Sequence, residues 1–373
     1  MIQTSAFTTK TCTVDAVFPR SSKSSTLDPA RDLLKVVYDV YESQWTGTGS
    51  PLVNYVFLHG SGMNRKVWEY YVDKLVLPDG KNSWKIGKII LIDQVNHGDS
   101  GVLNAQLLGT IYDWSDGARD VCKVCMDEFY DFPPKTEVLN VVVGHSMGGF
   151  QALSCAVLCP GLFDFVLCIE PVVWMKRIRN ARDDNMTIIS PSFFKALKGS
   201  MVDEFATKQE FFRFFDQFSL YANSAPAIKK LMRDFELQNV SEGRYRTKMS
   251  AQQHMLTYLT LNPTATWLMN SLSSLSLPVF CIYGNKSKWC PPENRDFLRN
   301  QIKRYREVEV DGDHLINIES PDFVIAKVNL EVGRLTANVT PEMQVNDSAR
   351  RSRFEKDYKT LLEERVLKGT PKL

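Results

Sequence analysis

Short apolar runs recur along the chain and alternate with stretches that have helical periodicity. The runs are rich in Val, Ile and Leu and lie at residues 55–58, 88–92, 139–143, 165–169, 278–283 and 307–310. Uninterrupted runs of this length are typical of strands buried on both faces of a parallel sheet. Residues 35–41 instead alternate apolar and polar side chains, as a half-buried strand does.

Helical patterns lie between these runs, at residues 67–76, 114–130 and 149–158. Strands that alternate with helices predict an α/β fold, in which a mostly parallel central sheet has helices on both faces. The alternation stops after Pro171, and residues 174–276 read as helical with no obvious strand. An insertion of this size between two sheet strands predicts a helical cap, or lid, over the core.

These changes of pattern divide the chain into four expected parts. They are an N-terminal segment at residues 1–30, a core at 31–173 and 277–334, a cap at 174–276, and a C-terminal helix and tail at 335–373. Residues 347–366 are highly charged and favour a helix. The total of 373 residues suffices for one large core with an inserted subdomain.

Charge and composition exclude several classes of protein. The net charge of +2 gives no basic field for nucleic acid, and no run of about 18 apolar residues predicts a transmembrane segment. The N-terminus lacks the apolar stretch of a secretory signal, so the eight cysteines are expected to be free thiols. Cys122 and Cys125 have no partners at zinc spacing and are interpreted as helix positions. We expect neither a metal nor a cofactor.

A nucleophilic serine is the strongest chemical signal in the sequence. The G-x-S-x-G pattern at residues 144–148 follows the apolar run at 139–143 and opens a helical stretch. This strand–turn–helix context is the one that lifts a serine oxygen clear of a sheet, where a base can reach it. The pattern therefore predicts Ser146 as the nucleophile.

An acyl-transfer enzyme also needs two backbone N–H groups that stabilise the developing oxyanion. The N–H of Met147, directly after the nucleophile, is expected to be one donor. The glycine-rich loop at residues 59–62 follows another apolar run and is expected to supply the other. Ser61 is the first choice in that loop and Gly62 the second.

The base is expected to be His314, one of only five histidines. It follows the last strand-like run and precedes a helix that Ser320 and Pro321 can start. A histidine on a late loop of this kind reaches over the nucleophile, and the chain order of serine, acid and histidine agrees with it.

The acid that orients the histidine is less clearly marked. The loop at residues 284–291 has no carboxylate, and the nearest acid beyond it is Glu293. Glu170, at the end of the run at 165–169, is preferred, although it could instead pair with a cap arginine such as Arg177. Asp311 and Asp313 are rivals, but Asp313 is badly placed to bond its own neighbour.

Together these motifs resemble the α/β-hydrolase superfamily over roughly residues 31–334. The segments concerned are residues 59–62, 93–100, 144–149 and 312–321. The usual acid of the superfamily falls on Ser287, so this chain departs from the pattern there. Some branches, including certain haloalkane dehalogenases, place the acid one strand earlier, which corresponds to Glu170.

Three segments resemble the peroxisomal lipases of yeasts more closely. They are residues 58–63, 91–100 with its unusual Asp-Gln-Val-Asn-His-Gly-Asp run, and 289–292. The resemblance implies hydrolysis of acyl esters, a peroxisomal location and a homodimer. The C-terminal Pro371, Lys372 and Leu373 resemble the S-K-L signal that a peroxisomal import receptor reads, with Pro as a departure. The cytoplasm is the alternative location.

Phenylalanines in the cap suggest a lining for the substrate. Phe211, Phe214, Phe215 and Phe218 have the spacing of one helix face, which either lines an acyl-chain pocket or packs the cap onto the core. The expected function is a serine hydrolase that cleaves lipid-like acyl esters through an acyl-serine intermediate. The alternatives are an acyl thioesterase and a hydrolase-fold binding protein with little turnover.

Overall fold

The computed structural model describes residues 7–45, 51–75, 84–129, 138–173, 190–241, 243–337 and 347–365. The chain divides into two compact units, Met1–Ala337 and Asn338–Leu373. The described part of the second unit is the charged helix α13 (Asp347–Arg365), which agrees with the helix predicted there. Pro371, Lys372 and Leu373 lie outside the described residues.

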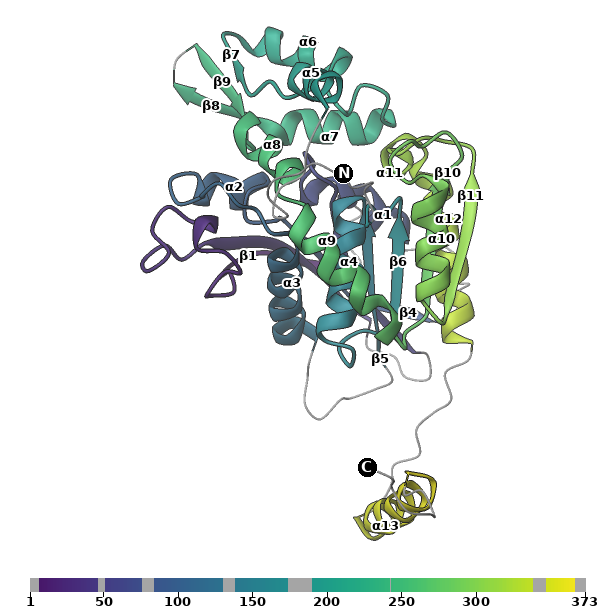
Figure 1. The fold of residues 1–373 in the computed structure, drawn as a ribbon. Coiled ribbons are helices and arrows are strands. Elements are labelled where there is room, and N and C mark those ends of the chain that lie inside the picture. Colours follow the sequence, from purple (N-terminus) through teal and green to yellow (C-terminus); the bar gives the residue numbers. More distant parts are fainter. Residues whose placement is uncertain are drawn as a thin grey trace. The chain divides into compact units, whose positions relative to one another are not determined.

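In the described part of the first unit, eight strands form the main sheet, in the order β1-β2-β4-β3-β5-β6-β10-β11 (Figure 1). Their bounds are β1 (Phe7–Asp15), β2 (Lys35–Ser43), β3 (Leu52–Leu58), β4 (Lys85–Ile92), β5 (Val138–His145), β6 (Phe165–Ile169), β10 (Val279–Gly284) and β11 (Tyr305–Val310). The strands from β4 to β11 pair in parallel, whereas β1 and β2 are antiparallel. The predicted fold class is confirmed.

Helices cover both faces of this sheet (Figure 1). They are α1 (Glu69–Leu75), α2 (Gly98–Asn104), α3 (Trp114–Phe129), α4 (Met147–Leu158), α9 (Asn262–Ser271), α10 (Pro292–Gln301), α11 (Ile316–Glu319) and α12 (Pro321–Thr336), with short 3-10 turns η2 (Lys23–Ser25), η3 (Arg65–Trp68) and η4 (Leu272–Ser274). In β3, Val56 and Leu58 pack toward α3 and α4, whereas Tyr55 and Phe57 pack toward α1 and α12. Because each face is buried, these strands read as continuous apolar runs. Strand β2 is also buried, so the prediction of a half-buried strand there is wrong, although buried Asp39 interrupts its apolar side chains.

The cap differs from its prediction because it contains strands. Its elements are α5 (Pro191–Ser200), β7 (Glu204–Phe205), α6 (Lys208–Gln217), α7 (Pro226–Glu236), β8 (Leu237–Ser241), β9 (Arg244–Thr247) and α8 (Ala251–Leu259). The strands form an antiparallel sheet in the order β7-β9-β8. They are short and mostly exposed, so they lack the apolar alternation that marks a strand in a sequence. A turn through Gly243, at φ 72°, allows β8 and β9 to pair.

The cap also ends earlier than residue 276. Leu261, Leu268 and Leu272 are buried in the core cluster beside α4, so α9 packs as a core helix. The alternation of strand and helix alone cannot separate a cap helix from a core helix, because both carry an apolar face.

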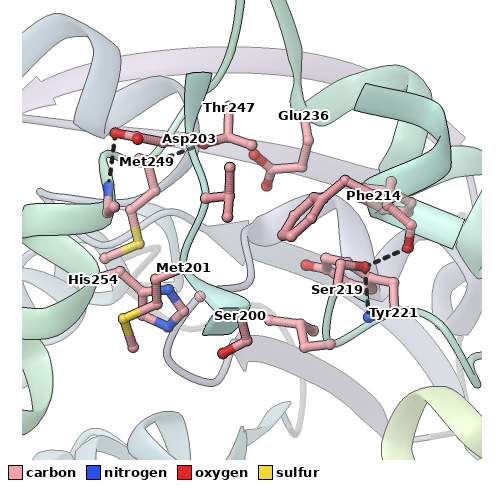
Figure 2. A pocket seen from close by; sticks show the side chains of 15 residues that line it. Ser200, Met201, Asp203, Phe214, Ser219, Tyr221, Glu236, Thr247, Met249 and His254 are labelled. Carbon is pink, nitrogen blue, oxygen red and sulfur yellow. Dashed lines mark hydrogen bonds between the residues drawn. The ribbon is translucent and has the colours of Figure 1, made fainter. Parts of the chain in front are cut away.

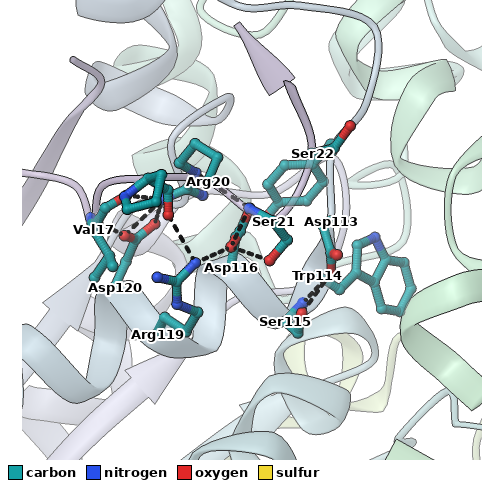
Figure 3. A network of polar contacts seen from close by, with 12 residues as sticks. Val17, Arg20, Ser21, Ser22, Asp113, Trp114, Ser115, Asp116, Arg119 and Asp120 are labelled. Atoms are coloured by element: carbon teal, nitrogen blue, oxygen red, sulfur yellow. Dashed lines mark hydrogen bonds and ion pairs between the residues drawn. The ribbon is translucent and has the colours of Figure 1, made fainter. Parts of the chain in front are cut away.

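The N-terminal segment is part of the core rather than separate from it. Strand β1 is the edge of the main sheet, and the chain after it is anchored to α3 (Figure 3). Arg20 donates to Asp120 at 2.8 Å and lies 3.4 Å from Asp116, while the Ser21 hydroxyl donates to Asp116 at 2.6 Å. The Arg20, Asp116 and Asp120 side chains are buried, so these ion pairs are shielded from water.

The cysteines are all free thiols. Cys122 and Cys125 are buried on α3, as expected for helix positions. Among the described helices, none combines the length and the apolar character needed to cross a membrane.

Candidate active site

Ser146 occupies the sharp turn between β5 and α4. Its backbone has φ 55° and ψ −113°, a conformation that non-glycine residues adopt only where the surroundings enforce it. The glycines on either side make the turn possible: a Cβ on Gly144 would come within 2.0 Å of the Gly148 carbonyl oxygen, and one on Gly148 within 2.2 Å of the Leu58 carbonyl oxygen. The serine is 8% exposed and lies at the carboxyl end of β5, a central strand of the sheet.

Two hydrogen bonds join Ser146, His314 and Glu170 in one line. The Ser146 hydroxyl lies 3.0 Å from Nε2 of His314, and Nδ1 of His314 lies 3.0 Å from Oε2 of Glu170. His314 comes from the loop between β11 and α11, and Glu170 directly follows β6. If Nδ1 carries the proton and donates to Glu170, Nε2 presents its lone pair to the serine hydroxyl.

Glu170 is held as a carboxylate by three donors. The Gly284 N–H donates to Oε1 at 2.6 Å, and the Ser287 hydroxyl and His314 both donate to Oε2. Burial by itself raises the pKa of the Glu170 carboxyl, but the bonds from His314, Ser287 and Gly284 outweigh it and hold that pKa below its ordinary value. Like Ser146, Glu170 has a positive φ, of 51°, at the end of its strand.

The other carboxylates that the sequence offered lie elsewhere. Asp311 pairs with exposed Lys286 at 2.8 Å, and Glu293 is exposed in the first turn of α10. Asp313 accepts the backbone N–H of His314 at 2.7 Å, so it steadies the loop. Arg177, the alternative partner for Glu170, lies outside the described residues.

Aromatic rings fix the position of His314. Trp289 stacks on its imidazole with ring centroids 5.3 Å apart. The ring centroid of His145 lies 5.1 Å from that of His314, and His145 Nε2 donates to the His314 carbonyl oxygen at 2.9 Å. Burial, with His314 close by, holds the pKa of His145 well below its ordinary value, so His145 is a neutral packing residue.

The predicted oxyanion donors differ in whether their N–H groups already make a hydrogen bond. Among the described residues, no acceptor faces the N–H groups of Ser61 or Met147. The N–H of Gly62, in contrast, already donates to Nε2 of His97 at 3.1 Å. Gly62 is therefore unavailable as a donor to substrate, and this second choice is wrong because a buried histidine occupies its N–H.

The Asp-Gln-Val-Asn-His-Gly-Asp run serves to hold the oxyanion loop. Burial keeps the pKa of His97 well below its ordinary value, and its Nδ1 bonds the Asn96 side chain at 2.7 Å, which leaves Nε2 free to accept. The next residue, Gly98, starts α2 at φ 53° and packs against Asp93, where a Cβ would come within 2.4 Å of a carboxylate oxygen. Asp93 in turn pairs with buried Arg65 at 2.5 Å.

The four cap phenylalanines do not share one role. Phe214 and Phe215 line a pocket beneath the cap (Figure 2). Phe211 is fully buried among rings of the cap and does not line that pocket. Phe218 is 58% exposed, because α6 ends at Gln217 and the helical face does not continue to it. Phe211 therefore agrees with the alternative interpretation, in which these rings pack the cap, and a role of the four residues in an acyl-chain pocket stays a prediction.

The described residues contain one group with the composition of a metal site. Donor atoms of Glu170, Cys290 and His314 lie within 4.8 Å of one another. Hydrogen bonds already engage them, since Cys290 donates to the Pro171 carbonyl oxygen at 3.2 Å and His314 bonds Glu170. Each of the three side chains thus has a hydrogen-bond partner within the protein.

Comparison with known proteins agrees with this geometry. The Alpha/beta hydrolase family matches residues 55–327. The chain belongs to the α/β-hydrolase family. It is 36% identical over 381 residues, 97% of each chain, to the peroxisomal membrane protein LPX1 of Saccharomyces cerevisiae. The solved structure of the peroxisomal alpha-beta-hydrolase Lpx1 from that yeast covers 98% of this chain and all of its own, with a TM-score of 0.89 at 36% identity.

More distant similarity is limited to part of the chain or to the fold. The type I acyl-CoA thioesterase mpaH' of Penicillium brevicompactum is 28% identical over 143 residues, which is 38% of this chain and 32% of that protein. A thioesterase domain from the curacin biosynthetic pathway covers 86% of this chain with a TM-score of 0.58 at 16% identity, and so shares the fold. Membership of this family indicates a hydrolase.

Sequence reasoning missed the residues that support the site. In the sequence, Ser287 is notable only because the superfamily usually has its acid at that position. In the structure, its hydroxyl donates a hydrogen bond to Glu170. His97, Trp289 and Arg65 act through contacts that link distant parts of the chain. The unusual run at residues 93–100 was the one signal that could have directed attention to His97.

Proposed function

We propose that this protein is a serine hydrolase that cleaves acyl esters through an acyl-serine intermediate, with Ser146, His314 and Glu170 as its catalytic residues. The observation that carries the proposal is the unbroken line of 3.0 Å contacts from the serine hydroxyl through the imidazole to a buried carboxylate. Such a line activates a serine and stabilises the imidazolium that forms when the serine loses its proton.

The reaction follows from this arrangement. The Ser146 oxygen attacks the ester carbonyl while Nε2 of His314 takes its proton, and Glu170 stabilises the charged ring. The N–H groups of Met147 and Ser61 bind the oxyanion. His314 then protonates the departing alcohol, and water activated by the same imidazole hydrolyses the acyl-serine.

An acyl thioester is the second candidate substrate, because it would use the same residues and the same acyl-serine. The partial likeness to the Penicillium acyl-CoA thioesterases favours it. A binding protein with little turnover is supported less well, since such a protein has no need of a strained serine aligned with a histidine and a carboxylate.

The cellular location that we propose is the peroxisome. The yeast relative is a peroxisomal protein by name, and the similarity covers 97% of both chains. The C-terminal Pro371, Lys372 and Leu373 would be read by a peroxisomal import receptor. A homodimer remains part of this proposal, as the family resemblance implies.

An active-site-directed fluorophosphonate tests the catalytic proposal. The wild-type protein is expected to be labelled at Ser146 and to hydrolyse a series of p-nitrophenyl esters of increasing chain length. Ser146→Ala is expected to lose both properties while keeping its fold. Ser154→Ala is the matched control, because Ser154 lies on the same helix and its hydroxyl donates to the Phe150 carbonyl oxygen, away from the proposed catalytic residues. Wild-type protein that neither reacts with the probe nor turns over any ester would refute the proposal.

A further inference from the structure

A pocket between the cap and the core adjoins the proposed oxyanion loop. Its wall includes Gly62, the residue after Ser61, together with apolar cap residues such as Met201, Phe214 and Met249. The cavity volume is about 60 Å³. An engineered cavity of about 150 Å³ holds one benzene molecule, so this smaller pocket has room for only a few carbon-sized groups. This is the space of a short segment of acyl chain.

A row of rings connects this pocket with the proposed catalytic histidine. Trp289 stacks on His314, the Tyr258 ring centroid lies 5.8 Å from that of Trp289, and the His254 centroid lies 5.7 Å from that of Tyr258. The His254 ring also contacts Gly62, where a Cβ would come within 2.5 Å of Nε2. Ring contacts therefore link His314 with His254, which lines the pocket.

Two buried polar atoms of the pocket wall are without a partner. Among the described residues, neither Oη of Tyr221 nor Nε2 of His254 makes a hydrogen bond. Figure 2 shows His254 and the carboxylate of Glu236 directed into the space that these residues surround. A buried polar group without a partner is costly, so unpaired groups of this kind in a pocket wall suggest that a ligand supplies the partner.

The groups that line the pocket disfavour a charged ligand. Burial lowers the pKa of His254 to about 4 and raises the pKa of Glu236 to about 7, so the surroundings favour the neutral form of each. The Asp203 carboxylate at the pocket wall would repel an anionic chain end. A hydroxyl suits Tyr221 and His254 alike, because it both donates and accepts a hydrogen bond.

We infer that this pocket selects acyl groups that carry a neutral hydrogen-bonding group, such as a hydroxyl, at a distance from the ester. The inference rests on the ester hydrolysis proposed above. In this arrangement Tyr221 and His254 bind the hydroxyl, and the methionines and Phe214 surround the methylene groups next to it. Tyr221 and His254 are then specificity-determining residues and take no part in the chemical step.

The test compares p-nitrophenyl esters of ω-hydroxy acids of six, eight and ten carbons with their unsubstituted parents. For at least one chain length, wild-type kcat/KM is expected to be about tenfold higher for the hydroxy ester than for its parent. Tyr221→Phe is expected to remove most of this preference, since one hydrogen bond corresponds to a factor of about three to ten. His254→Phe provides a second variant that removes the other partner.

Tyr55→Phe is the matched control, because Tyr55 also has a buried hydroxyl without a partner among the described residues, but on β3 in the core. It is expected to keep the wild-type ratio. Equal rates for hydroxy and parent esters at every length would overturn the inference, as would a preference for ω-amino or ω-carboxy esters. The proposed function fails separately, if no ester of any kind is hydrolysed and Ser146 is not labelled.

Discussion

Glu170→Gln separates a catalytic carboxylate from a structural one. The substitution keeps the shape of the side chain and replaces one acceptor oxygen by an NH₂ donor. In either orientation the new NH₂ group faces a hydrogen-bond donor. Oε1 of Glu170 accepts the Gly284 N–H at 2.6 Å, and Oε2 accepts from Ser287 and His314.

The less costly orientation places the NH₂ at the position of Oε2. There the Ser287 hydroxyl can rotate and accept, and His314 can change tautomer so that Nδ1 accepts. The proton of the imidazole then sits on Nε2, facing the Ser146 hydroxyl, and the ring cannot act as a base. The variant therefore folds but holds its histidine in the unproductive form.

The expected loss of kcat is large. In a serine protease the corresponding change of carboxylate to amide lowers kcat by about 10⁴, which is about 5 kcal/mol at about 1.4 kcal/mol per tenfold. The opposite orientation, with two donors facing each other at Gly284, would instead cost about 1–3 kcal/mol of stability. Measurement of kcat on a p-nitrophenyl ester, with thermal unfolding beside it, distinguishes the two.

Asp311→Asn and Asp313→Asn are the controls for this experiment. Asp311 is exposed and pairs with Lys286, and Asp313 accepts only a backbone N–H at the site, so we expect kcat within about tenfold of wild type for both. A Glu170→Gln protein whose kcat is within about threefold of wild type would contradict the role assigned to Glu170.

Three further predictions concern stability and location. Burial raises the pKa of Glu236 from 4.5 to about 7, so ionisation of this carboxyl destabilises the folded protein increasingly as the pH rises from 4.5 to 7. In urea unfolding at pH 8, Glu236→Gln should therefore have a free energy of unfolding up to about 3 kcal/mol above that of wild type. At pH 4 the two proteins should be equally stable. Asp120→Ala should lower the free energy of unfolding by about 3 kcal/mol, because buried Arg20 loses one of its carboxylate partners. Asp28→Ala breaks an exposed ion pair and should lower it by less than about 1 kcal/mol. Deletion of residues 371–373 should move a fluorescently tagged protein from peroxisomes to the cytosol without changing its specific activity, and a diffuse full-length protein would contradict the assignment of that signal.

The parts of the fold that the sequence predicted are those where local pattern and tertiary environment agree. The middle of β5 and the whole of β6 are buried on both faces, so residues 141–143 and 165–169 are apolar and the runs are recognisable. Strand β1 was missed because its side chains are largely exposed and polar at the sheet edge. The cap strands were missed for a similar reason, since pairing between β8 and β9 depends on a turn and not on burial.

The same distinction applies to the candidate site. Ser146 and the oxyanion loop were recognisable because a sharp turn demands glycines at fixed positions in the sequence. His97 was not, because its role depends on a hydrogen bond to Gly62, 35 positions away in the chain. Hydrogen bonds between distant loops leave no local periodicity, so only the folded chain reveals them.

Position 287 offers a test of whether the acid of the proposed catalytic residues can be moved to another strand end. Residue 287, where the superfamily usually has its acid, and Nδ1 of His314 both bond the same oxygen of Glu170. A carboxylate at 287 should therefore reach the imidazole once Glu170 is shortened. Glu170→Asn suits this purpose, because asparagine tolerates the positive φ of 51° and vacates the Oε2 position.

We expect Glu170→Asn to lose most of its kcat and the double variant Glu170→Asn/Ser287→Asp to regain at least about tenfold, or about 1.4 kcal/mol of barrier. Glu170→Asn/Lys288→Asp is the matched control, since it adds a carboxylate to the same loop at an exposed position. Equal recovery in both double variants would mean that a general charge effect, and not a relocated acid, restores the rate. Absence of recovery in the variant that carries the new carboxylate at position 287 would show that the imidazole accepts its acid only from the end of β6.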